Sequence, residues 1–172
     1  YLSNVTQIAE NPNANSQVTG TIDIKNSGNG NVYGMKANGW VTNVAADAWV
    51  DEGGANALAN AKGNIHITNS GSGDSFGMYS ENYASNATAN AGMAEGISGT
   101  ATAMAVGTID LINEGKGNAY GIYAPIIENR KDSKTNSVIE MVNTDSGLAI
   151  GTYAKDGSID NSGTIKIHDL GD

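Results

Sequence analysis

Acidic side chains recur at one position of a repeated segment, and paired carboxylates are the groups that hydrolyse glycosidic bonds. Asp23, Asp110 and Glu140 share this position, so stacked repeats would place them in one column on one face. Glycoside hydrolysis needs two carboxylates facing one sugar. His66 interrupts the column, however, and an acidic stripe that is simply solvated explains the same spacing. A polysaccharide lyase or glycosidase stays open as the enzymatic alternative, and we predict no catalytic residue.

Basic side chains add little catalytic chemistry. The only arginine, Arg130, lies in the polar segment 128–134, whereas a lyase needs a basic residue beside an acidic cluster on a strand. His66 and His168 occupy positions that hold Asp, Glu, Lys, Thr or Val in other repeats, so we interpret them as surface residues. No Gly-x-Ser-x-Gly segment is accompanied by a matching His and Asp, which argues against a serine protease. We predict a protein that is not an enzyme and uses no cofactor.

One segment, Gly71–Gly77, resembles the glycine-rich nonapeptides that bind calcium. Those nonapeptides have one more residue between the second glycine and the aspartate, which is Asp74 here. The position of Asp74 is held in other repeats by Asn31, Asn118 and Leu148, so a carboxylate ligand is not repeated. We therefore interpret this segment as a turn and predict no metal site.

Aromatic side chains are the strongest candidates for contact with a partner. Three tyrosines share an outward position, which Lys36 occupies in the first repeat, and two tryptophans lie in the long segment between the first two repeats. Exposed rings of this kind stack on sugars or anchor a protein partner. The alternative is that the rings cover neighbouring backbone and shield a glycine-rich strand. The candidate contact residues are Tyr79, Tyr123, Tyr153, Trp40 and Trp49.

The composition of the chain excludes several classes of protein. It has 172 residues, nine Lys and Arg against 18 Asp and Glu, a net charge of −9 and no cysteine. Nucleic-acid binding needs clustered positive charge and is not expected. No apolar run approaches ~20 residues, and no charged start precedes an apolar stretch, so we predict neither a membrane-spanning helix nor a signal peptide. The 23 Gly, 22 Ala and 22 Asn indicate either low complexity or a repeat.

The repeat is found by aligning five segments. They begin 43, 44, 30 and 26 residues apart, and we place the repeat units near 20–62, 63–106, 107–136, 137–162 and 163–172. The long unit is either one coil of ~44 residues or two coils of ~22. The aligned segments are Gly20–Ala37, Gly63–Ser80, Gly107–Ala124, Ser137–Ala154 and Gly163–Gly171.

The sequence of each repeat unit predicts a strand, a turn and a second strand. The first strand alternates apolar and polar residues, with an isoleucine column that starts at Ile22 and a second apolar column that starts at Ile24. An asparagine follows at the same turn, where it can bond to the neighbouring coil, and glycines at the corner are expected to supply positive φ. The predicted turn ladder is Asn26, Asn69, Asn113 and Asn143.

The second strand carries two apolar columns that we predict to point inward. One column contains Tyr33, Phe76, Tyr120 and Ile150, and the other contains Met35, Met78, Ile122 and Thr152. Alternating alanines, at positions 55–61 and 101–105, are interpreted as strands on a third, tightly packed face where only small side chains fit.

Stacking such units in register buries a continuous core, which defines the expected fold. We predict an all-β protein, a parallel β-helix or β-solenoid, with residues 1–172 forming a single segment. Roughly eight coils at ~4.8 Å each would form a rod about 40 Å long. Because the fifth repeat stops within the pattern, we expect the segment to belong to a longer solenoid.

The sequence resembles the passenger domains of bacterial autotransporters, the type V secreted surface proteins. The resemblance rests on the repeated strand and turn Gly-Thr-Ile-Asp-Ile-x-Asn-Ser-Gly and on the strand Gly-Asn-Ala-Tyr-Gly-Ile-Tyr-Ala, as in Gly107–Ala124. It covers residues 20–172. It implies a right-handed parallel β-helix displayed at the surface of a Gram-negative bacterium and usually exported through a C-terminal β-barrel.

Resemblance to this family does not identify a single function. We expect a non-catalytic adhesin or aggregation segment, extracellular or on the cell surface, that contacts a protein or glycan on another cell or associates with itself. The alternatives are a subunit or stalk of an extracellular filament, a secreted toxin segment, and the polysaccharide-acting enzyme discussed above.

Overall fold

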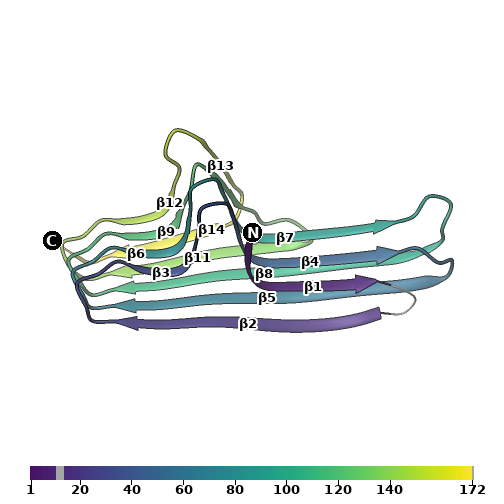
Figure 1. Cartoon of the computed structure of the whole chain (residues 1–172), viewed down its shortest axis with the longest axis horizontal. Helices are drawn as coiled ribbons and strands as arrows, with labels where there is room; N and C mark the ends of the chain where they lie inside the picture. The colour runs from purple at the N-terminus through teal and green to yellow at the C-terminus, as the bar shows by residue number, and fades with distance from the viewer. Residues whose placement is uncertain (11–13, 172) are drawn as a thin grey trace.

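The computed structural model describes residues 1–10 and 14–171, and every regular element in these ranges is a β-strand. The strands form three parallel sheets, and each of the first four turns of the chain contributes one strand to each sheet in order (Figure 1). Each strand therefore pairs with the strand three elements away, which is the arrangement of a parallel β-helix. The predicted all-β solenoid fold is confirmed.

The three sheets differ in the length of their strands. Sheet A contains β1 (Leu2–Glu10), β4 (Trp40–Val50), β7 (Tyr83–Met93), β10 (Ile126–Asn129) and β13 (Ser158–Asn161). Sheet B contains β2 (Ala14–Asn26), β5 (Ala55–Asn69), β8 (Gly99–Asn113), β11 (Thr135–Asn143) and β14 (Thr164–Asp169). Sheet C contains β3 (Val32–Ala37), β6 (Ser75–Ser80), β9 (Ala119–Tyr123) and β12 (Ala149–Tyr153).

Each repeat is a single turn of three strands. Ile22 pairs with Ile65, and Ile65 pairs with Ile109, so the two long spacings separate adjacent strands of sheet B. The two shorter spacings also separate adjacent strands of this sheet. The alternative of two 22-residue coils and the estimate of eight coils are therefore wrong, because sheets A and B each contain five described strands.

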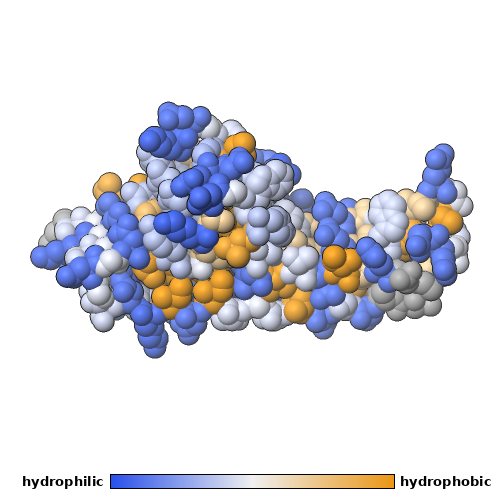
Figure 2. All heavy atoms as spheres, viewed as in Figure 1, coloured by the Kyte–Doolittle hydropathy of each residue, from blue (hydrophilic) through white to orange (hydrophobic). Residues whose placement is uncertain are grey.

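The molecule is wider along its strands than it is tall along the stack. Five strands at ~4.8 Å spacing span only about 20 Å, whereas a 15-residue strand such as β5 extends for about 50 Å. The longest axis accordingly lies along the strands (Figure 1). On the face shown in Figure 2, hydrophobic and hydrophilic residues are interspersed along this axis. The predicted rod of about 40 Å along the stack is replaced by a short, broad β-helix.

The main core is built from the two apolar columns that the sequence predicts for the first strand of each repeat. Its side chains in sheet B are 1% exposed or less in the three middle turns, whereas Ile167, on the outermost strand of the sheet, is 41% exposed. Side chains of sheets A and C complete the same cluster. The fully enclosed members from sheet B are Ile65, Ile67, Ile109, Leu111, Ile139 and Met141.

A second, thinner core fills the other end of the long strands. The alternating alanines do not form a separate face, as the sequence suggested, because they continue the inward positions of β5 and β8 ahead of Ile65 and Ile109. They share a buried cluster with Ala46, Ala48 and Val50 of β4. Small side chains on both strands allow sheets A and B to lie close together here. The third face of the helix, which the sequence analysis assigned to the alanine segments, is formed by sheet C.

The predicted asparagine turn ladder is confirmed. Each side-chain amide donates to the side-chain oxygen of the next turn, and the inner members also donate to carbonyls of their own corner loop, as Asn113 does to Gly115 and Gly117. Asn69, Asn113 and Asn143 are fully buried. The distances along the ladder are 2.8 Å for Asn26–Asn69, 3.1 Å for Asn69–Asn113, 2.8 Å for Asn113–Asn143 and 2.9 Å for Asn143–Asp169.

A second asparagine ladder, which the sequence analysis did not identify, runs up sheet A. Asn43 and Asn86 donate across the interior to the carbonyls of Gly63 and Gly107 in sheet B, at 3.1 Å each. The ladder lies between the two cores, since Val41 belongs to the main core and Val44 to the alanine core. Its amide-to-amide distances are 3.0 Å for Asn4–Asn43, 2.9 Å for Asn43–Asn86, 3.2 Å for Asn86–Asn129 and 2.7 Å for Asn129–Asn161.

Corner glycines are required for a different reason from the one predicted. Among the described glycines, only Gly54 and Gly96 have positive φ, and neither lies at the repeated corner. At the corners, successive turns lie so close that a Cβ on Gly71 would overlap the carbonyl of Gly28, and a Cβ on Gly115 would overlap that of Gly71. The repeated glycines therefore allow backbone to stack on backbone.

The second strand departs from the predicted inward pattern in one of its two columns. Met35, Met78 and Ile122 are buried in the main core as expected. The column of Tyr33, Phe76 and Tyr120 instead lies on the outer side of sheet C, where its rings contact the outward tyrosines. The glycines that follow these rings point inward, and a Cβ on Gly77 would overlap Ile109. Alternation thus breaks at this glycine, which moves the aromatic column to the surface.

We expect Asn113→Ala to lower the free energy of unfolding by about 2–4 kcal/mol, because it leaves the Asn69 amide and the carbonyls of Gly115 and Gly117 without their partners. Denaturant unfolding followed by circular dichroism measures this loss. The matched control, Asn26→Ala, changes the half-exposed outer end of the same ladder and should cost about 1 kcal/mol. Equal losses at the two positions would contradict a ladder whose strength depends on burial.

The inward glycines of sheet C give a second stability prediction. Gly77→Ala should lower the free energy of unfolding by about 1–3 kcal/mol, because the new methyl group overlaps Ile109 and the carbonyl of Gly121. In Gly30→Ala the added methyl group meets no atom within 4 Å, so this control should change stability by at most about 0.5 kcal/mol. Thermal unfolding compares the two, and a tolerated Gly77→Ala would argue against the close approach of sheets B and C.

Candidate functional site

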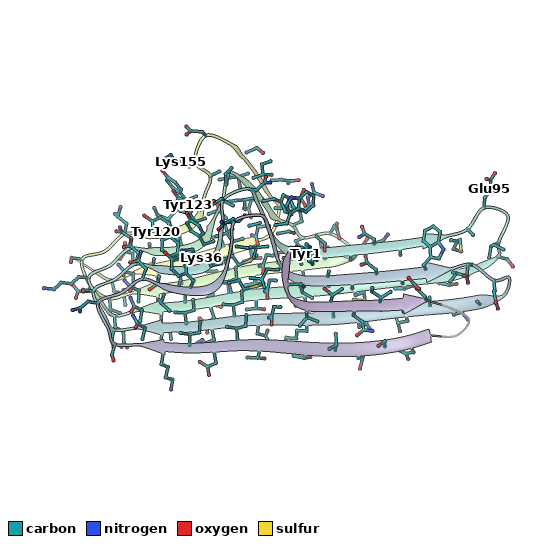
Figure 3. The ribbon with its side chains drawn as sticks, in the orientation of Figure 1. Tyr1, Lys36, Glu95, Tyr120, Tyr123 and Lys155 are labelled. Atoms are coloured by element: carbon teal, nitrogen blue, oxygen red, sulfur yellow. The ribbon has the colours of Figure 1, made fainter. Side chains whose placement is uncertain are left out.

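Six aromatic rings form a continuous stack on the outer side of sheet C, which we call the aromatic stack. Rings in the same column lie face to face, with centroids 4.9 Å apart for Phe76–Tyr120 and 5.2 Å apart for Tyr79–Tyr123. Rings in adjacent columns meet edge to face, at 5.6 Å for Tyr120–Tyr123 (Figure 3). The members are Tyr33, Phe76, Tyr79, Tyr120, Tyr123 and Tyr153.

The geometry of the aromatic stack limits what it can bind. A sugar binds an aromatic side chain through the ring face, but the inner rings have both faces covered by their neighbours in the column. At the first turn, the Nζ atom of Lys36 lies 4.4 Å from the centroid of Tyr33 and 5.4 Å from that of Tyr79. The arrangement therefore favours the alternative in which these rings join successive turns and cover a glycine-rich strand.

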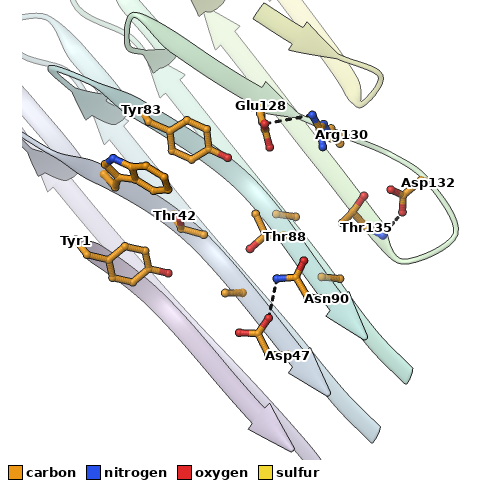
Figure 4. A pocket seen from close by; sticks show the side chains of 14 residues that line it. Tyr1, Thr42, Asp47, Tyr83, Thr88, Asn90, Glu128, Arg130, Asp132 and Thr135 are labelled. Carbon is orange, nitrogen blue, oxygen red and sulfur yellow. Dashed lines mark hydrogen bonds and ion pairs between the residues drawn. The ribbon is translucent and has the colours of Figure 1, made fainter. Parts of the chain in front are cut away.

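A groove on the outer side of sheet A offers accessible rings and polar groups together, and we call it the sheet A groove (Figure 4). Its volume is about 340 Å³. Trp40 is paired with Tyr83 in the sheet, and their ring centroids are 4.9 Å apart. Trp40 is 54% exposed and Tyr1, one turn below, is 76% exposed, so ring surface remains open to solvent. Exposed aromatic rings thus border one side of the groove.

Polar side chains from three turns line the rest of the sheet A groove. The Asn90 amide donates to the Asp47 carboxylate at 2.8 Å, which leaves the amide oxygen and a carboxylate oxygen for a ligand. At the opposite wall, Arg130 lies 3.2 Å from Glu128 and 2.7 Å from Asp160. Arg130 thereby joins two successive turns, and these contacts raise its pKa further.

Tyr83 is the groove residue with the largest shift in pKa. Burial, together with the nearby Glu128 carboxylate, raises the pKa of Tyr83 from 10.0 to about 12. The phenol therefore keeps its proton over the whole physiological range and can donate a hydrogen bond. Tyr83 combines an apolar ring face with a hydroxyl group inside the same groove.

The structure separates the five predicted contact residues into three places. Trp40 lies in the sheet A groove, whereas the three tyrosines lie in the aromatic stack. Trp49 is 47% exposed at the far end of β4, where its indole covers the backbone of Gly92. Sequence reasoning missed Tyr1 and Tyr83, because neither belongs to a repeated column and only the pairing of the sheet A strands places Tyr83 beside Trp40. It also placed Arg130 in a polar segment away from any acidic cluster, although the structure pairs it with two carboxylates.

The predicted outward column of charged residues is confirmed, but it is paired more closely than a solvated stripe. His66 Nδ1 lies 2.9 Å from Asp110 in the next turn, and Lys166 Nζ lies 3.6 Å from Glu140. Basic and acidic side chains therefore meet between turns. Across residues 1–10 and 14–171, no three His, Asp or Glu side chains converge as a metal-ligand set.

Comparisons with protein-family models, with curated proteins and with solved structures gave no match for this chain. Its class is therefore defined by its own architecture, a parallel β-helix with three sheets and two asparagine ladders. In the described ranges, no helix is long and apolar enough to cross a membrane.

The pKa of Tyr83 predicts how stability depends on pH. Because this pKa is near 10.0 in the unfolded chain and about 12 in the folded chain, the associated stability is present below pH 10 and is lost as the pH rises to 12. Tyr83→Phe should therefore lose less stability than the wild type between these pH values. Denaturant midpoints measured at intervals across the range check this, and parallel curves for the two proteins would contradict it.

Proposed function

We propose that this chain is a non-catalytic contact segment of a surface-displayed or secreted protein, of the adhesin or aggregation type. The observation that carries the proposal is the sheet A groove, where open aromatic faces and hydrogen-bonding groups line one concave surface. The β-helix and its repeated motifs also agree with the resemblance to autotransporter passenger domains. That resemblance supports an extracellular location at a bacterial surface as part of the proposal.

The chemistry of the sheet A groove favours a neutral glycan as the ligand. Aromatic rings such as Trp40 stack on the apolar faces of sugars, and amide and hydroxyl groups recognise their hydroxyls. The groove also contains carboxylates, including Asp47, Glu128 and Asp132, and the chain carries a net charge of −9. An acidic polysaccharide would be repelled by these charges. Arg130 does not offset them, because it is already paired within the protein.

The arrangement of carboxylates supports binding over hydrolysis. A glycosidase needs one carboxyl group that carries a proton beside a second that is free to act as a base or nucleophile. Glu128 and Asp160 instead both accept hydrogen bonds from Arg130. Their position next to a basic residue is closer to the requirement of a lyase than the sequence suggested, so the binding assay below includes product analysis.

Trp40→Ala is expected to weaken binding of a neutral oligosaccharide at least about tenfold, because it removes the exposed indole face that borders the sheet A groove. A glycan array identifies the ligand, and titration calorimetry measures the dissociation constant. The control Trp49→Ala removes an equally large exposed ring outside this groove and should leave affinity unchanged.

A second comparison distinguishes the groove from the aromatic stack. Replacing Tyr79, Tyr123 and Tyr153 by serine should lower thermal stability but retain binding at any temperature where the protein is folded. Binding that is lost in this variant and kept in Trp40→Ala would place the site on the stack instead. Release of reducing ends or unsaturated products from the bound glycan would overturn the non-catalytic proposal.

A further inference from the structure

The turns of the β-helix change length, and this leaves a step in the stack. The first three turns have long strands in sheets A and B, whereas β10 contains four residues and β11 contains nine. In the described ranges, β10 pairs with β7 only as far as Ser85, and β11 pairs with β8 only from Ala105 onward. The segments 87–93 of β7 and 99–104 of β8 therefore form a ledge with an open edge (Figure 1).

Peptide groups along this ledge point toward the open edge. In a parallel sheet, alternate residues of a strand bond to opposite neighbours. Ala94 donates to Val50 in β4, so the peptide groups of Ala91 and Met93 are directed away from β4. Ala105 donates to Lys134 above it, and by the same alternation the groups of Ala101 and Ala103 face upward beside the step. Both strands of the ledge present a row of donors and acceptors for another strand.

The ledge lacks the features that normally protect a sheet edge. Natural proteins cover such edges with lysine, proline, bulges or a loop, because an open edge pairs with other chains. Segments 87–93 and 99–104 contain neither a charged residue nor a proline, although the chain has 27 charged residues. Their inward side chains are alanine or glycine except Met93 at the outer end, which pairs with the buried Val50, so a strand added above them would continue the alanine core.

We propose that the ledge is an interface for a second copy of this chain, in a closed two-fold dimer. A rotation axis across the ledge pairs β7 with β7 of the second copy and β8 with β8, each in antiparallel orientation. The residues whose peptide groups face the open edge in one copy then lie opposite the same kind of residue in the other copy. Outward side chains of the two copies lie next to each other, as an antiparallel pair requires. Because the same patch is used twice, the association closes at two copies and does not continue into a filament.

Charges at the two ends of the ledge agree with this arrangement. The outer end of the ledge is the connection 94–98, where Glu95 is exposed at the tip of the molecule (Figure 3). The inner end is the exposed connection 130–134, where Lys131 and Lys134 outnumber the single carboxylate, Asp132, and Arg130 is already paired with Glu128 and Asp160. Antiparallel pairing brings the acidic end of one copy to the basic end of the other. A parallel arrangement would instead place like charges together.

Concentration-dependent association of the full 172-residue chain tests this proposal. Sedimentation from about 1 µM to about 1 mM covers the affinity range expected of an interface below the standard size, and it should show a monomer converting to a species of twice the mass. Thr102→Lys and Thr102→Glu each place like charges close together across the axis and should weaken association at least about fivefold. An equimolar mixture should restore it, because unlike charges then meet.

Cross-linking provides a second measurement that does not depend on affinity. The chain has no cysteine, so Thr102→Cys introduces a single thiol on the ledge, and a short bismaleimide should join two copies. The control Thr108→Cys lies on the same strand but beneath β11, where it pairs with Val138, and should stay monomeric. A wild type that remains monomeric, assemblies that grow beyond two copies, or equal cross-linking of both variants would overturn the proposal.

Discussion

Each turn of this β-helix must place the same side chain above its equivalent in the turn below, and buried asparagine amides impose that requirement. Asn69 and Asn113 in one ladder, and Asn43 and Asn86 in the other, find their partners in a single register. A slip of one residue would remove every amide from its ladder and turn the isoleucines of sheet B outward. Because an unpaired amide inside the protein is costly, the ladders specify the stack as well as stabilise it.

With the register fixed, the thickness of the interior determines which side chains fit. The second ladder divides the interior into a wide part that holds Ile65 and Ile109 and a thin part that holds alanine. Glycine replaces even alanine where backbone lies against backbone, as at Gly71. The ledge lies on the thin part, where β10 and β11 are too short to cover β7 and β8, and the groove extends to it from Trp40 and Tyr83 on the other side of the ladder.

The sequence predicted what repeats and failed where the alternation is broken. Columns such as Ile22–Ile65 and the ladder through Asn69 follow from spacing alone, because every turn repeats them. The outward position of Phe76 could not be predicted in this way, since Gly77 and Met78 both point inward and shift the phase of the strand. The site depends on residues that occur once, and only the paired strands show that Arg130 and Asp160 meet.

The in-register pairing also determines how this protein responds to force. Contacts between turns join residues about 43 positions apart in the long turns, and each turn is held mainly by its immediate neighbours. Pulling on the chain therefore peels off one turn at a time from an end of the stack. Each long turn releases about 150 Å of extended chain. The short turns that contain β13 and β10 release less chain. They also pair with their neighbours over fewer residues, so they detach at lower force than the long turns.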